Sequence, residues 1–265
     1  MNNKRYTISI CKGAGLLDET RTLLESWVPS DSLNSFSERV QSTGVLSKCT
    51  AYRTRDIVRR VFARRYLRPS SMPARSLKQL LAAGCSQRDF SDIVMLYACR
   101  NDDLLYDFVR DFFWRARNDG KLVVTMDDAR AFLDDASRAG LIPTPWSPAV
   151  QIKIARGLLG ALREFGMIEE HKRGLREIAS YRPTDIAVAY LAYDLHSLGL
   201  SDGAVCSHDD WMLYGLNRNT VISRLEDLQD RGLFAMQHAG SVVTITWQFG
   251  SMEEAIDAIA ERLIR

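Results

Sequence analysis

The chain has 265 residues, of which 46% are apolar, and its 35 basic residues against 33 acidic ones leave a formal charge of +2. This composition excludes a disordered tail, which has fewer apolar residues and more net charge, and a collagen-like or linker sequence, which is richer in glycine and proline. A chain of this length is expected to form about two domains, each with its own core.

Membrane and secretory signals are not found in the sequence. The most apolar stretch, Ile186 to Leu195, is shorter than the ~18 to 20 residues that cross a bilayer and includes Asp194. The segment from Met1 to Ile10 lacks the apolar run of a signal peptide. Five cysteines form an odd set without a C-x-x-C pair, which argues against disulfides and a zinc site. We therefore expect a cytoplasmic protein with no membrane segment.

Helical periodicity dominates the first 142 residues. Apolar residues recur at helical spacing from Leu16 to Trp27, and the cluster from Pro29 to Asp31 ends this helix. Further helices are predicted at about 50–67, 74–83, 88–99, 103–117 and 127–139. Because strand patterns are almost lacking here, residues 1–142 are predicted to form a helical bundle.

The helix predicted from Thr50 to Leu67 lies in a strongly basic segment. Between Lys48 and Lys78 the sequence has ten basic residues and only one acid, Asp56, so this segment carries +9, whereas the remaining 25 basic and 32 acidic residues carry −7. Clustered charge of this kind attracts polyanions, because phosphate binding is driven by counterion release. The candidate DNA-binding residues of this segment are Arg53, Arg55, Arg59, Arg60, Arg64, Arg65 and Arg68.

Two interpretations of these arginines stay open at the level of sequence. In the first, they face solvent and hold phosphates. In the second, they pair with carboxylates of neighbouring helices, which the acidic surplus of the rest of the chain is able to supply.

The run from Pro143 to Pro148 marks a boundary. Two prolines cannot lie inside a helix, whereas Pro148 suits a first helical turn with Ser147 as the N-cap. Residues 143–183 are predicted to be a connecting helical module. Two segments share one pattern, in which a helix is followed by a glycine and then by two apolar residues: Arg156 to Glu170 in this module and Ser223 to Gln237 near the C-terminus. The shared pattern raises the possibility that the module is a degenerate helix-turn-helix.

The last third of the chain has the element order of a winged helix. A helix at 184–198, a turn at 199–204, a short helix at 207–214, a helix at 219–231 and strands at 233–238 and 241–248 are predicted. Residues 184–265 are therefore assigned to a winged-helix-like domain with a short β-hairpin. The candidate DNA-binding residues of its recognition helix are Asn217, Arg218, Asn219, Thr220, Ser223 and Arg224. Glu226, Asp227 and Asp230 lie on the same helix and oppose this function; many winged helices contact only proteins.

Catalytic and metal-binding patterns are not recognised in the sequence. Gly13-Ala14-Gly15 lacks the third glycine of a dinucleotide fingerprint and the Lys-Ser/Thr of a P-loop, and the four histidines have no metal-binding spacing. No catalytic residue, cofactor or metal is therefore expected, and the protein is predicted not to be an enzyme.

Several segments together resemble the BrxA family of BREX, a bacterial system that restricts bacteriophages. They are Tyr6-Thr-Ile-Ser, the stretch from Gly13 to Leu17, the helix with Arg53, Arg55, Arg59 and Arg60, Trp146-Ser-Pro, and the stretch from Gly157 to Ile168. The resemblance implies a small helical accessory protein, similar in its N-terminal bundle to the antitermination factor NusB, that binds DNA and works beside other BREX proteins.

The overall expectation is a mainly α, non-enzymatic protein that binds double-stranded DNA through the basic helix and the winged helix. An RNA-binding NusB-like factor is one alternative, because an arginine-rich helix can also enter distorted RNA. A scaffold for other defence components, with the arginine helix meeting an acidic partner, is the other. The oligomeric state is not predicted.

Overall fold

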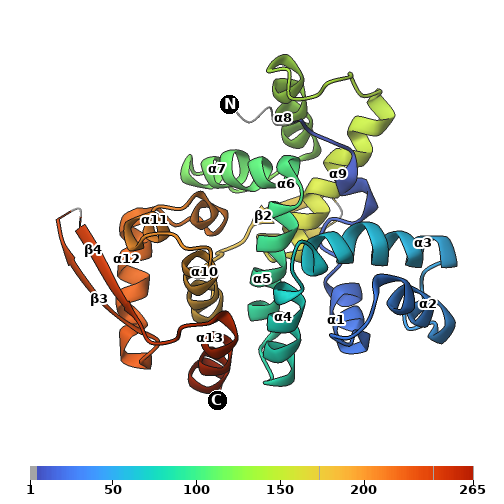
Figure 1. Ribbon diagram of the computed structural model, residues 1–265. Helices are drawn as coiled ribbons and strands as arrows, with labels where there is room; N and C mark the ends of the chain where they lie inside the picture. Colours follow the sequence, from blue (N-terminus) through green and yellow to red (C-terminus); the bar gives the residue numbers. More distant parts are fainter. Residues whose placement is uncertain (1–4, 173, 241, 265) are drawn as a thin grey trace. The chain divides into compact units, whose positions relative to one another are not determined.

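The computed structural model describes residues 5–172, 174–240 and 242–264 and shows a mainly α protein with short antiparallel hairpins (Figure 1). This confirms the predicted fold class. The chain divides into two compact units, the first made of Met1–Ala74 and Val94–Tyr181 and the second of Arg75–Ile93 and Arg182–Arg265. Within the described residues, no helix has both the length and the apolarity that a bilayer crossing requires.

The first unit contains the basic helix and most of the elements before residue 181. Its elements are η1 (Ser9–Lys12), α1 (Leu17–Ser26), α2 (Leu33–Thr43), α3 (Ala51–Asp56), η2 (Ile57–Leu67), the second half of α5 (Gln87–Arg100), α6 (Asp103–Asp107), η3 (Phe108–Phe113), α7 (Trp114–Asn118), α8 (Met126–Arg138), α9 (Pro148–Glu164), β1 (Ile168–Lys172) and β2 (Leu175–Ile178).

Side-chain caps explain where these helices begin. Thr50 accepts a hydrogen bond from the Arg53 amide and starts α3, and Ser147 accepts one from the Val150 amide ahead of Pro148. The predicted start of α9 is thereby confirmed. Helix α2, capped by Ser32, was not predicted, because only Phe36 and Val40 mark its apolar face.

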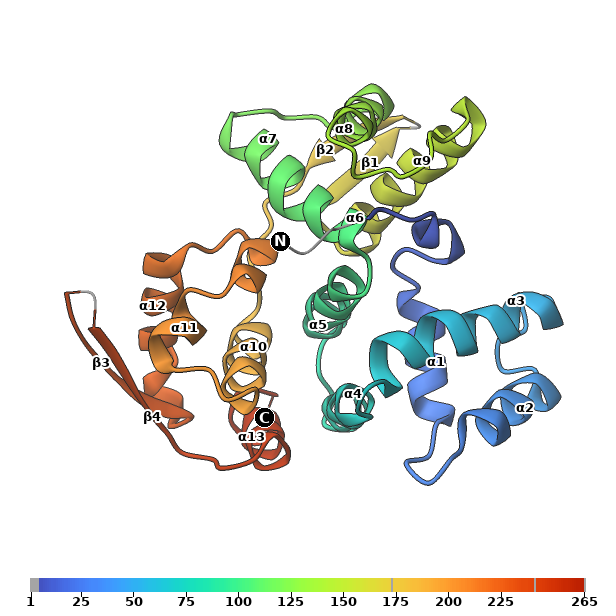
Figure 2. The ribbon, with the colours of Figure 1, turned by 45° about the horizontal axis from the view of Figure 1, so that its top comes forward.

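The apolar face of the basic helix packs into an aromatic core. Phe62 is 1% exposed, and its ring centroid lies 5.7 Å from that of Phe36 on α2 and 5.3 Å from that of Tyr66. Figure 2 shows α2 beside α3, which agrees with the contacts between these helices. Burying large aromatic side chains fixes which face of the helix points outward.

A second hairpin follows α9 and was not predicted as such. Strands β1 and β2 pair antiparallel, with Ile168 opposite Ile178, and Val123 adds an isolated bridge to Glu177. Figure 2 shows the hairpin beside α9, which β1 contacts. The sequence signal was weak because these strands are short and carry charged residues at most positions.

The second unit contains the C-terminal elements, drawn in orange to red in Figure 1. Apart from the residues that α4 (Met72–Ala82) and α5 contribute, its elements are α10 (Asp185–Ser197), α11 (Asp202–Cys206), η4 (Asp209–Tyr214), α12 (Arg218–Asp227), η5 (Gln229–Arg231), β3 (Phe234–Ala239), β4 (Val242–Trp247), α13 (Met252–Ile259) and η6 (Ala260–Ile264).

Helix α10 forms the centre of this unit. Every residue from Ile186 to Tyr193 is buried, and α10 contacts α11, α12 and α13. The predicted hairpin is confirmed, with Phe234 opposite Trp247. Its second strand was predicted to start at Ser241, which lies outside the described residues.

Two helices of this unit differ from the expectation. Helix α11 occupies part of the predicted turn at 199–204, and α13 was not predicted, although Ser251 caps it. The element order agrees with a winged helix, and that assignment stays a prediction. The predicted domains 1–142, 143–183 and 184–265 also stay a prediction; by packing, residues 143–181 group with the first unit.

Candidate nucleic-acid interface

The basic helix shows a sharp division between its inner and outer faces. Helix α3 continues directly into η2, whose hydrogen bonds span five residues, so the helix runs from Ala51 to Leu67. Between Arg55 and Arg64, every exposed position is an arginine, namely residues 55, 59, 60 and 64. Arg68 just after the helix is also exposed, and Arg53 is partly exposed.

Arg65 does not belong to this outer face, which corrects its inclusion among the candidate DNA-binding residues. Its side chain is 6% exposed. The guanidinium donates to the carbonyl oxygens of Gly13, Ala14 and Gly15 at 2.9, 2.9 and 3.2 Å. The reason lies in helix geometry: Arg65 follows Val61 and Phe62 on the inward face, and backbone carbonyls there satisfy its donors.

The outer arginines are hardly neutralised by carboxylates. Arg60 pairs with Asp56 at 3.1 Å and remains 57% exposed. Arg59 donates to two neutral groups, the Asn34 side-chain oxygen at 2.9 Å and the Ser37 hydroxyl at 3.3 Å. No acid of the described residues pairs with the other four, which are Arg53, Arg55, Arg64 and Arg68. We call Arg53, Arg55, Arg59, Arg60, Arg64 and Arg68 the cationic strip.

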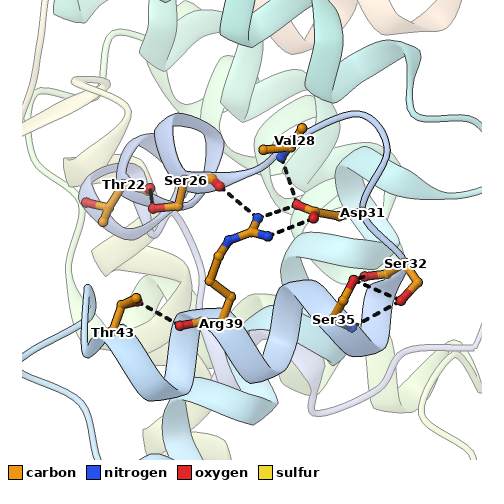
Figure 3. Close-up of polar contacts among 8 residues, drawn as sticks. All are labelled: Thr22, Ser26, Val28, Asp31, Ser32, Ser35, Arg39 and Thr43. Atoms are coloured by element: carbon orange, nitrogen blue, oxygen red, sulfur yellow. Dashed lines mark hydrogen bonds and ion pairs between the residues drawn. The ribbon is translucent and has the colours of Figure 1, made fainter.

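Arg39 on α2 shows the opposite situation. Its guanidinium forms a two-armed contact with Asp31, with Nη1 2.7 Å from Oδ1, and Nη2 also donates to the Ser26 carbonyl oxygen at 3.0 Å (Figure 3). The hydrogen bond with Asp31 raises the pKa of Arg39. Because Asp31 already accepts these bonds, Arg39 has little free charge to offer a ligand.

In helix α12 of the second unit, some of the candidate polar side chains form the cap of the helix itself. The Asn217 side chain accepts a hydrogen bond from the Thr220 amide at 3.1 Å and caps the helix, and the Thr220 hydroxyl donates to the Asn217 carbonyl oxygen at 2.8 Å. Asn219 and Ser223 are exposed, and Arg218 is half-buried. The outward face of α12 therefore offers mainly neutral polar groups.

Arg224 is the second correction to the predicted DNA-binding set. It is 8% exposed and donates to the Asp185 carboxylate at 2.7 Å and the Pro183 carbonyl oxygen at 3.2 Å. These bonds tie α12 to the start of α10, because Arg224 falls on the same side of the helix as the buried residues Val221 and Leu225.

Acidic residues weaken the electrostatic case for α12. Asp227 and Asp230 are exposed, and Glu226 lies 2.9 Å from His238 of β3. The strands β3 and β4 themselves contain no lysine or arginine. A phosphate near this helix therefore meets more negative charge than one near the cationic strip.

Two further residues of this region, one on the basic helix and one from another segment, were not singled out by the sequence pattern. Tyr52 is 73% exposed at the first turn of that helix, where an aromatic ring can stack on a base or sugar. Lys12 of η1 lies 3.9 Å from Asp56. Lys12 is distant in sequence, so only tertiary structure reveals it. Among the described residues, no group of three or more His, Cys, Asp or Glu side chains is arranged to hold a metal.

Comparisons with known proteins give one family and one fold. The family described as BrxA matches residues 4–193 of this chain. The crystal structure of an uncharacterized protein from Magnetospirillum magneticum is similar, with a TM-score of 0.59 and 20% identity, over 72% of this chain and 94% of that one. At this identity the similarity concerns the fold alone. Curated proteins provide no match.

Proposed function

The chain belongs to the BrxA family, and on that premise we propose that it is a non-catalytic component of BREX that binds double-stranded DNA. The cationic strip is the principal contact in this proposal. Its arginines hold the phosphate backbone, and α12 with the hairpin β3–β4 adds a second, weaker contact. The protein acts in the cytoplasm with other BREX proteins.

The observation that carries the proposal is the unbroken series of exposed arginines from Arg55 to Arg64. A helix face that is only solvated normally carries acidic as well as basic side chains. This face has a single carboxylate, Asp56, whose side chain is only 10% exposed. Arginine presents a planar fork of donors that matches phosphate geometry. The strip thus supports binding to a regular array of phosphates.

Phosphate contacts position a protein but do not read sequence. The proposal is therefore that the strip supplies affinity that is common to all duplexes. Asn219, with Ser223 beside it on the exposed side of α12, supplies any sequence preference, since an amide side chain can pair with an adenine edge in the major groove.

Fluorescence anisotropy of a labelled duplex, measured over a range of salt concentrations, tests this function. If each of the six arginines neutralises one phosphate, the slope of log K against log salt is about −5. Unrelated duplex sequences should differ in affinity by no more than the preference of about 1 kcal/mol that Asn219 supplies. Flat binding across the salt range would defeat the proposal.

Competition with structured RNA separates DNA from RNA as the natural ligand. At equal phosphate concentration, duplex DNA should displace the labelled probe more effectively than a hairpin RNA. If the hairpin RNA displaces the probe more effectively, the cationic strip binds RNA in preference to DNA, and the DNA-binding proposal is wrong.

A further inference from the structure

A cleft of about 330 Å³ lies at the C-terminal half of the basic helix, entirely within the first unit. Three segments form it: the turn that includes η1, the C-terminal half of η2, and the turn before α6. Its charged lining residues are Lys12, Arg60, Arg64, Arg65 and Asp102, and its polar ones are Thr7, Ser9 and Asn101. Four of the five charged residues carry a positive charge, so the cleft concentrates charge that the strip elsewhere spreads along the helix.

The cations of the cleft are held in place without being fully neutralised. Asp56, 10% exposed, lies 3.9 Å from the Lys12 ammonium and 3.1 Å from the Arg60 guanidinium, so one carboxylate serves two cations. Arg64 is exposed and pairs with no acid of the described residues. The wall therefore combines two cations that a shared carboxylate holds, Lys12 and Arg60, with one exposed arginine, Arg64, that is available to a ligand.

Arg65 supplies charge from behind the cleft. Its guanidinium is buried, and its hydrogen-bond acceptors are the carbonyl oxygens of residues 13 to 15, not a carboxylate. Carbonyl dipoles stabilise the guanidinium without neutralising it, and a charge with little solvent around it acts over a longer range. Asp102, which also lines the cleft, interacts electrostatically with Arg65 and offsets part of this charge.

The turn that binds Arg65 has a backbone shape that its glycines permit. Gly13 has a φ of 141°, and at Gly15 a Cβ would collide with the Glu164 carboxylate. The lone Gly-Ala-Gly sequence is thus explained by the shape of the turn that binds Arg65, whose first glycine lines the cleft.

Asp102 is the one carboxylate that lines the cleft, and its oxygens are already in use. Oδ1 accepts from the amides of Leu104 and Leu105 at 3.1 and 3.2 Å, and Oδ2 accepts from the Ser9 hydroxyl at 2.6 Å. Burial raises the pKa of this carboxyl. Its bonds with the start of α6 and with Ser9 therefore occupy both carboxylate oxygens.

We propose that this cleft is a binding site for a phosphate group, a mono- or diester, held by Lys12, Arg60 and Arg64 with Arg65 behind them. Charge-assisted hydrogen bonds from several cations are the usual means by which proteins bind phosphate. The site shares Arg60 and Arg64 with the strip, but phosphate binding in the cleft does not require that the strip binds duplex DNA.

The first test is calorimetric titration of the full-length protein with inorganic phosphate at constant ionic strength. The native protein should show saturable binding. Lys12→Gln and Arg64→Gln should each weaken it about tenfold, because each removes a charge-assisted hydrogen bond. Arg115→Gln is the matched control, since residue 115 is 82% exposed in the first unit, belongs to neither the strip nor the cleft, and should change binding less than about twofold because salt screens it.

The source of the phosphate is found with two duplexes of the same sequence, one with 5′-phosphate and one with 5′-hydroxyl ends. If a terminal phosphate enters the cleft, the phosphorylated duplex binds more tightly and Lys12→Gln removes the difference. If an internal phosphate enters, the variant weakens both duplexes equally. If the ligand is a small phosphate compound, Lys12→Gln weakens the binding of inorganic phosphate and leaves the affinity for both duplexes unchanged. All three results support the site.

No saturable binding of inorganic phosphate at millimolar concentration would overturn the proposal, as would an equal loss in Arg115→Gln. Thermal unfolding of each variant verifies that it is folded. Failure of the DNA-binding function is recognised separately, because it abolishes duplex binding and leaves the phosphate titration intact.

Discussion

The basic helix and helix α12 both bring arginines to a face that the sequence marked for DNA, yet they use them differently. The basic helix turns four arginines fully outward and one, Arg53, partly outward, and keeps Arg65 for its own packing. Helix α12 buries Arg224 against α10 and presents acids beside neutral polar groups. The comparison teaches that the number of arginines on a helix says little until each guanidinium has been followed to its partner.

The largest effect is expected from reversing charge on the strip. Arg60→Glu with Arg64→Glu should lower duplex affinity by about 100-fold or more at low salt, and equally for unrelated sequences, because phosphate contacts are lost and repulsion is added. Anisotropy titration measures it.

The matched control for this variant is Arg115→Glu with Arg138→Glu. It makes the same change in net charge at side chains that are 82% and 77% exposed, on α7 and α8 of the first unit. Duplex affinity should fall no more than about threefold, since distant exposed charges are screened. An equal loss in both double variants would mean that net charge, and not the strip, governs binding.

The inner arginines should affect folding more than binding. Arg65→Met leaves three carbonyl oxygens without their donor and should lower the free energy of unfolding by about 2 kcal/mol, with a smaller loss for Arg224→Met, which has fewer acceptors. Urea denaturation measures both. A stable Arg65→Met protein with weakened duplex binding would return Arg65 to the DNA-binding set.

Single substitutions by neutral residues distinguish the roles of the two helices, because only the loss of a phosphate contact changes the salt dependence of duplex binding. Arg55→Gln should make the log–log salt slope less negative by about 0.9, the contribution of one phosphate. Asn219→Ala on α12 should leave the slope unchanged and alter only the preference among duplex sequences, by about 1 kcal/mol. A change of slope in Asn219→Ala would place α12 among the phosphate contacts.

The smallest effect concerns pH. Burial raises the pKa of Asp102 above its value in the unfolded chain, and the charged group that opposes this shift is Arg65. The folded state then binds a proton more readily than the unfolded state, so the contribution of Asp102 to stability decreases as pH rises through that interval. The Asp102→Asn variant has no carboxyl at this position, so it does not lose stability in this way as pH rises.

The difference in unfolding free energy, Asp102→Asn minus native, should therefore be larger at pH 7 than at pH 4. Denaturation at the two pH values provides the comparison. A difference that shrinks with rising pH would show that the Asp102 carboxylate is stabilised in its ionised form, contrary to the raised pKa.

The sequence predicted most of the fold because strong local signals agree with the tertiary structure. Ser147 with Pro148, Gly166 and Gly232 each mark a helix end that the structure contains. Helices α2 and α13 were missed because short apolar faces stand out little from their surroundings, and strand β1 because it is largely charged.

The candidate site was predictable only in part. Periodicity identifies the helix that carries the arginines, and the spacing from Val61 and Phe62 already favours an inward position for Arg65. It does not show that the carbonyl oxygens of a distant turn, at residues 13 to 15, accept the hydrogen bonds of Arg65. Lys12 joins the same region through Asp56, a contact between segments far apart in the chain. Such long-range pairing follows from packing that no local pattern encodes.

The most direct test of the central claim is the affinity of the native protein for one labelled duplex at ~50 mM and ~200 mM salt. If the six arginines of the cationic strip each contact one DNA phosphate, the affinity should fall by about 10³-fold between the two conditions. An affinity that stays the same, or the lack of any duplex binding at the lower salt concentration, would contradict the account.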